Sequence, residues 1–181
     1  MNRDTARVAL AAIAAAELAA GAARFTERGK VFAAAQARAK ALGRPLVVVG
    51  DPDAGAQTRI ARAYGCGDLC LDLNDCPKCP TSQASDLTTG TSPVPRDSAV
   101  VYCSCVLEYV PDVHAAIAEL RRMAGSDANL FMTRVQPVTL TAYLYPGAQW
   151  TISPTLKATT VCPYRKAALV AGLGWLAWSA R

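Results

Sequence analysis

Four consecutive apolar residues, Leu46 to Val49, constrain the fold of this chain more than any other feature. Three of them are valines, and so short a β-branched run is typical of a strand that is buried on both faces. The run ends at once in the turn Gly50-Asp51-Pro52-Asp53-Ala54-Gly55, and a helix is expected over about 56–64. Strand, glycine turn and helix, in this order, are the usual opening of a nucleotide-binding α/β unit.

The same alternation of strands and helices continues along the chain. A helix over 30–42 that ends at Gly43 precedes the first strand, and an amphipathic helix is expected over 113–123. Further strands are expected over 68–73, 99–105 and 129–135. This order predicts an α/β fold with a doubly wound, mostly parallel sheet over residues 27–181.

Two regions depart from this alternation. Residues 74–97 are rich in Pro, Ser, Thr, Cys and Gly, so we expect a loop with one short strand near 84–87 and no helix. Residues 139–145 and 149–161 are rich in Thr, Tyr and Ile and flank Pro146-Gly147. They predict an antiparallel strand pair at the C-terminal side of the sheet.

Both ends of the chain carry apolar segments. Val8–Ala23, within an N-terminal helix assigned to residues 1–26, is almost all Ala and is interrupted by Glu17. It is shorter than the roughly 20 residues needed to span a bilayer. A membrane anchor, a helix lying on the domain or on a membrane, and a frayed helical tail all remain open for it. Residues 166–180 contain two tryptophans and predict a helix packed on the sheet, with an interfacial membrane patch as the alternative.

Charge and cysteine content give the expected setting of the protein. The net charge of +5 suits an anionic partner or a membrane surface, or simply a basic soluble protein, and no Lys/Arg run with interleaved aromatics indicates nucleic-acid binding. The seven cysteines are odd in number, and three of them fall in strand-like segments. We therefore expect reduced thiols and a cytoplasmic protein, with membrane association as an addition.

One cysteine pair has the spacing of a metal site. Cys76 and Cys79 form a CxxC turn, and Cys66 and Cys70 precede it closely. Such a turn can present two thiolates to one zinc ion, so Cys76 and Cys79 are candidate ligands. Ordinary buried or loop thiols are the simpler interpretation, and a redox pair is the least favoured because Pro80 follows where a helix should begin.

The stretch 99–123 resembles the fourth strand and following helix of class I S-adenosylmethionine-dependent methyltransferases. Val106-Leu107-Glu108-Tyr109-Val110-Pro111-Asp112 stands where that family often has Val-Leu-Glu-His-Val and a Pro-Asp that opens a helix. The stretch 85–101 is also similar, and the resemblance covers roughly residues 45–135. It implies a Rossmann-like methyltransferase fold, an S-adenosylmethionine cofactor and an unidentified methyl acceptor.

The resemblance also implies which residues bind the cofactor. Gly50, Asp51, Asp53 and Gly55 fall in the family's glycine loop, while Asp72 and its neighbour Leu73 fall at the acid that binds the ribose. Asp86 with Leu87 falls near the adenine. Cys103 and Ser104 end the fourth strand and complete the set.

The glycine loop departs from the family pattern. Val48 replaces the usual acid, Pro52 lacks an N–H donor, and Asp51 and Asp53 would repel the carboxylate of the cofactor. The alternative to a methyltransferase is therefore a non-catalytic scaffold or interaction protein of the same fold. Either one could be attached to a membrane. His114, the only histidine, is expected on the polar side of its helix and carries no catalytic role.

Overall fold

A five-stranded parallel sheet forms the centre of the computed structural model, which describes residues 2–54, 61–134, 144–145, 147–153 and 155–180. Its strands are β1 (Leu46–Val49), β2 (Leu69–Asp72), β3 (Ser82–Ala84), β4 (Val100–Ser104) and β5 (Leu130–Thr133). They lie in the order β3-β2-β1-β4-β5, and every neighbouring pair is parallel. The predicted α/β class with a mostly parallel sheet is therefore confirmed.

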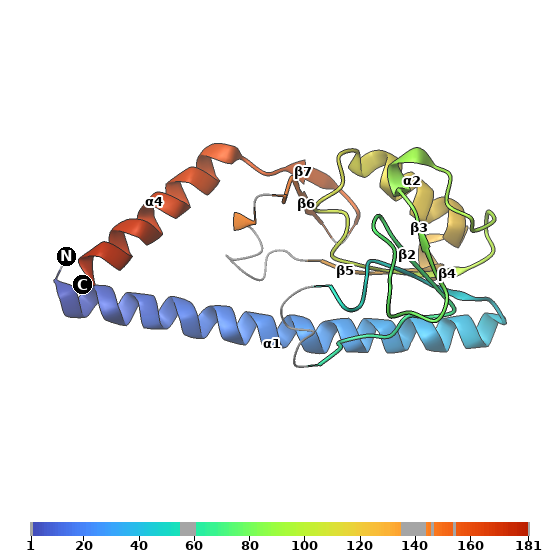
Figure 1. Ribbon diagram of the computed structural model, residues 1–181, viewed down its shortest axis with the longest axis horizontal. Coiled ribbons are helices and arrows are strands. Elements are labelled where there is room, and N and C mark those ends of the chain that lie inside the picture. Colours follow the sequence, from blue (N-terminus) through green and yellow to red (C-terminus); the bar gives the residue numbers. More distant parts are fainter. Residues whose placement is uncertain (1, 55–60, 135–143, 146, 154, 181) are drawn as a thin grey trace.

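Helices cover both faces of this sheet (Figure 1). The C-terminal half of α1 (Arg3–Leu42) packs on one face through Phe32, Ala35 and Ala39, which recur at helical spacing. On the other face α2 (Val113–Ala124) buries a stripe that consists of Val113, Ala116, Ile117, Leu120 and Met123. The Asp112 carboxylate accepts hydrogen bonds from the N–H groups of residues 114 and 115, so it caps the start of α2. Two hydrophobic cores result, one under each helix.

The N-terminal helix is longer than the sequence indicated. The two helices expected over the first 42 residues are one continuous helix, which ends at Gly43 with a left-handed φ of 61° as predicted. The boundary that we placed after residue 26 thus falls inside α1. By length and composition, α1 is apolar enough to cross a membrane.

The crossover from β2 to β3 lacks a helix, as the loop-rich sequence predicted. Residues 73–81 make the connection, and the strand expected near 84–87 is β3, followed by the short 3-10 helix η2 (Leu87–Thr89). Parallel strands usually need a longer, helical crossover. The helix expected over 56–64 falls mostly outside the described residues, and residues 61–64 are not helical. A second 3-10 helix, η3 (Asp127–Asn129), leads into β5.

The C-terminal region corrects two predictions. The antiparallel pair consists of β6 (Trp150–Ile152) and β7 (Ala158–Thr160), so both strands come from 149–161, while residues 139–143 lie outside the described part. The last helix, α4 (Pro163–Ser179), does not pack on the sheet and has no buried residue. It contacts the N-terminal part of α1 instead (Figure 1).

Candidate functional site at the strand ends

The carboxyl ends of β2, β1 and β4 meet at one edge of the sheet. The N–H of Gly50 donates to the carbonyl of Leu71 over 2.8 Å, and the N–H of Asp51 donates to Asp72 Oδ2 over 3.1 Å. On the other side of β1, a Cβ atom on Gly50 would lie only 3.0 Å from the carbonyl oxygen of Ser104. Three segments that are far apart in the sequence thus meet here, and we name Gly50, Asp51, Asp72 and Ser104 the strand-end site.

Gly50 is required at this position by its backbone. Its φ is +100°, a conformation that side chains rarely adopt, and a Cβ atom would also lie 2.8 Å from Cγ2 of Val106. The close approach of the β1 and β4 ends therefore depends on a residue without a side chain. Gly55, the second glycine that we predicted, lies outside the described residues.

Asp72 organises the loop that follows β1. One of its carboxylate oxygens accepts from Asp51 N–H, and the other accepts from Asn74 N–H over 3.1 Å. The carboxylate of Asp51 in turn accepts from Asp53 N–H over 2.9 Å, and Pro52 between them is fully buried. The carboxylates of Asp51 and Asp72 therefore hold this loop in place.

The negative charge of Asp53 is compensated. Arg62 donates two hydrogen bonds to its carboxylate, and Lys78 Nζ lies 3.9 Å away. The hydrogen bond from Arg62 lowers the pKa of Asp53, and the charges of both cations act in the same direction. The repulsion that we expected between this loop and an anionic group is therefore offset at Asp53.

The remaining predicted residues occupy different surroundings. Asp86 accepts hydrogen bonds from the N–H and the hydroxyl of Thr88, and these bonds lower the pKa of its carboxyl. Leu73 is exposed, whereas Leu87 and Cys103 belong to the core under α2. Burial raises the pKa of the Cys103 thiol well above its usual value, so this thiol is neutral and inside the protein.

Sequence reasoning missed two buried polar residues beside the strand-end site. Tyr64 is buried, with its hydroxyl 3.5 Å from the Gly50 carbonyl oxygen and 3.4 Å from that of Asp51. Arg28 Nη2 donates to Sγ of Cys105, the residue after β4, over 2.8 Å. Arg28 is only 9% exposed, and its Nε has no hydrogen-bond partner among the described residues. Arg28 lies at helical spacing from Phe32, Ala35 and Ala39, which form the buried face of α1. This spacing could have predicted from the sequence that Arg28 faces inward.

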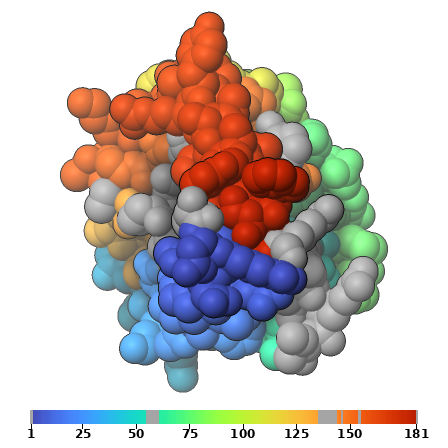
Figure 2. Space-filling model, turned by 90° about the vertical axis from the view of Figure 1, so that its left-hand side faces the viewer, coloured from blue at the N-terminus to red at the C-terminus, as the bar shows by residue number. Residues whose placement is uncertain are grey.

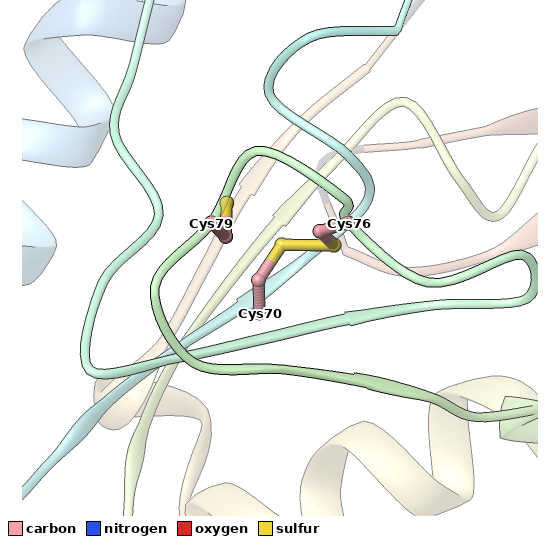
Figure 3. Close-up of side chains that lie close together, drawn as sticks. All are labelled: Cys70, Cys76 and Cys79. Carbon is pink, nitrogen blue, oxygen red and sulfur yellow. A yellow bond between two sulfur atoms is a disulfide. The ribbon is translucent and has the colours of Figure 1, made fainter.

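A second feature is a group of four cysteines beside the β2–β3 crossover. Cys66 and Cys79 form one disulfide, and Cys70 and Cys76 form another, so the expectation of reduced thiols is wrong for these four. The Sγ atoms of Cys70, Cys76 and Cys79 all lie within 4.8 Å of one another, in the core under α1 (Figure 3). The two predicted zinc ligands are therefore brought together, but they are engaged in bonds to different partners.

An open hollow of about 600 Å³ lies between α2 and η2, away from the strand-end site. Arg121 and Arg122 line it, but Arg121 pairs with Asp127 and Arg122 pairs with Glu119. Arg96 also lines the hollow, and because two of these three arginines are already paired, we assign no ligand to it.

Searches of protein-family models, of curated proteins and of solved structures find no match to this chain. An assignment of function therefore depends on the residues and on their arrangement.

Proposed function

We propose that the strand-end site binds S-adenosylmethionine and that the protein transfers the methyl group of this cofactor to an acceptor. The observation that carries the proposal is that the loop after β1 meets the ends of β2 and β4: Asp51 N–H bonds to Asp72, and Gly50 lies against the carbonyl of Ser104. The order β3-β2-β1-β4-β5 reverses between β1 and β4. Ligands of open α/β sheets bind at this switch point, beyond the carboxyl ends of the strands.

The residues present suit such a cofactor. Gly50 keeps the ends of β1 and β4 close together, and the carboxylate of Asp72 can accept hydrogen bonds from ribose hydroxyls. Asp86 follows β3 at the same edge of the sheet, and we assign it to the adenine amino group. Arg28 supplies a cation bonded to Cys105, the residue after Ser104, which suits the carboxylate of the methionine part.

The reaction requires little chemistry from the protein. When bound, the cofactor supplies a methyl group that its sulfonium already activates. The chain has to hold the acceptor in line with that group and exclude water. The proposed reaction therefore does not require a histidine base, and His114 is exposed at the start of α2.

Titration of the full chain with S-adenosylmethionine and with S-adenosylhomocysteine tests the proposal. We expect heat and a rise in melting temperature with both compounds, and about tenfold weaker binding for Asp72→Asn, since a charged hydrogen bond is worth roughly 1.5–3 kcal/mol. Asp127→Asn is the matched control, because it removes an exposed carboxylate in η3, outside the strand-end site. No heat and no thermal shift at millimolar ligand would leave the non-catalytic scaffold as the function.

The cysteine cluster supports a second candidate function. We propose that, once reduced, Cys66, Cys70, Cys76 and Cys79 bind one zinc ion, because three of the sulfurs already lie within 4.8 Å of one another. Four thiolates around zinc at about 2.3 Å require sulfur–sulfur distances of this size. A dithiol reductant converts each disulfide to two thiols and becomes a disulfide itself, and the thiols release their protons when they bind the ion.

Metal analysis of anaerobically reduced protein tests this second function. We expect one zinc per chain in the wild type and in Cys162→Ala, whose cysteine is exposed and outside the cluster. Cys76→Ala should reduce the zinc content strongly. Reduced wild-type protein that holds no zinc would show that the four cysteines act only as disulfides.

A further inference from the structure

The N-terminal half of α1 leaves the α/β body and is exposed to solvent. Between Ala6 and Arg28 none of the described residues of this helix is buried. Val8 and Leu18 expose 70% and 76% of their surface. This half of the helix therefore contributes nothing to the cores that hold the sheet (Figure 1).

The C-terminal helix α4 leaves the body on the same side, and the two helices meet at their far ends. Arg3 and Arg7 donate their Nε–H groups to the carbonyl of Ala180, over 3.4 Å and 3.1 Å. Ala6 is fully buried, which agrees with close contact between the helices there (Figure 2). Two segments from opposite ends of the sequence thus form one unit, the protruding helix pair, which consists of residues 3–27 and 163–180.

The surface of this helix pair is too apolar for water. An 18-residue window of α1 has a mean hydropathy of 1.6, and none of that window is buried inside the protein. On α4 the exposed aromatic side chains are Tyr164 at its start, and Trp175 and Trp178 near its end. Apolar patches of this extent on a protein surface mark a partner or a membrane.

Length and side-chain order fit a lipid bilayer. Eighteen helical residues extend about 27 Å, close to the hydrocarbon thickness of about 30 Å. Arg3 and Arg7 stand at the tip of the helix pair, and Arg165 is exposed at its base. Aromatic and basic residues at both ends of an apolar span match the two headgroup layers.

We propose that the protruding helix pair inserts as a unit into a lipid bilayer and holds the α/β body against the membrane at its base. Both helices enter because their tips are bonded to each other. The inference does not depend on methyl transfer. Glu17 is the only charged residue between Arg7 and Arg24, so its burial opposes insertion and offers a variant that should strengthen it.

Flotation of the full chain with vesicles of phosphatidylcholine and phosphatidylserine tests insertion. We expect wild-type protein to float and to resist extraction by alkaline carbonate. Leu18→Glu should lower vesicle binding about tenfold or more, because a carboxylate in the hydrocarbon layer is strongly unfavourable. Trp178→Glu should also lower binding, because it removes an aromatic anchor from the headgroup layer. Glu17→Gln should increase binding.

Ala33→Glu is the matched control, since Ala33 is exposed on the half of α1 that packs on the sheet. It should bind vesicles like the wild type. None of the four substitutions is at a buried residue. Every variant should therefore have the circular dichroism spectrum and the melting temperature of the wild type.

Three results would overturn the proposal. The first is binding that salt or carbonate reverses, which would indicate attraction to headgroups alone. The second is equal loss of binding in Ala33→Glu and Leu18→Glu. The third is a stable dimer in light scattering that ignores vesicles, which would show that a second copy covers the helix pair.

Discussion

The connection between β2 and β3 has no helix and is held by two disulfides instead. Removal of these disulfides should lower the stability of the protein measurably. They join Cys66 to Cys79 and Cys70 to Cys76, across 13 and 6 residues of chain. The loop-entropy relation gives about 3 kcal/mol for the longer loop and about 2 kcal/mol for the shorter one. The shorter loop lies within the longer one, so the two effects should not simply add.

Alanine pairs separate the two bonds. Cys66→Ala with Cys79→Ala should lower the free energy of unfolding by about 3 kcal/mol, which corresponds to roughly 6–12 °C in melting temperature for a chain of this size. Cys70→Ala with Cys76→Ala should cost at least as much as its loop predicts, because both side chains are completely buried. Denaturant unfolding of oxidised protein without metal gives the values.

Cys162→Ala, a change to an exposed cysteine outside the cluster, is the control and should leave stability unchanged. A thiol reductant should lower the stability of the wild type, and should not affect a variant in which all four of these cysteines are alanine. The reasoning is refuted if Cys66→Ala with Cys79→Ala unfolds at the same denaturant concentration as Cys162→Ala. Recovery of stability on adding zinc to the reduced wild type would support the second candidate function.

Three further changes test other parts of the structure. Gly50→Ala should cost about 1–3 kcal/mol in urea unfolding, since its φ is +100° and its Cβ would crowd Val106; unchanged stability would mean that the loop adopts another conformation. Glu119→Gln should cost about 1–3 kcal/mol at pH 7, because the buried carboxylate accepts from Arg122. The hydrogen bond from Arg122 lowers the pKa of Glu119 in the folded protein. This stabilisation is therefore fully present above the pKa that Glu119 has in the unfolded chain, and it is lost as the pH falls through the lower pKa of the folded protein. A stability difference between Glu119→Gln and wild type that does not shrink in acid would contradict this. Asp112→Ala should cost about 1 kcal/mol by loss of the α2 cap, and no loss in thermal unfolding would refute the capping role.

The strands and α2 followed from local patterns. The run Leu46–Val49 and the stripe along 113–123 each match their element within about a residue, because burial on both faces or on one face leaves a periodic signature. The parallel direction of the sheet followed from the alternation of strands and helices. All four residues of the strand-end site were candidates in the sequence, since each ends a strand or lies in the turn that follows one.

The missed residues depend on contacts between distant segments. Arg28 and Cys105 are 77 positions apart, and their pairing arises only when α1 lies across the end of β4. Cys103 and Leu87 were predicted at the cofactor, and they lie instead in the core under α2 because of how this helix covers the sheet. Cysteine pairing likewise follows from the path of the crossover and not from the CxxC spacing, which suggested that Cys76 and Cys79 would act together.

By itself, the sequence determined which segments are strands and helices, because hydrophobic period, turn residues and caps act over a few neighbouring positions. It also determined that both ends of the chain are apolar. Only the tertiary structure decided that α1 is one helix, that α4 leaves the sheet to meet its tip, and that four cysteines close two disulfides. These outcomes depend on contacts between segments that are far apart in the sequence and meet only after the sheet has formed. Patterns over a few neighbouring residues cannot predict such contacts.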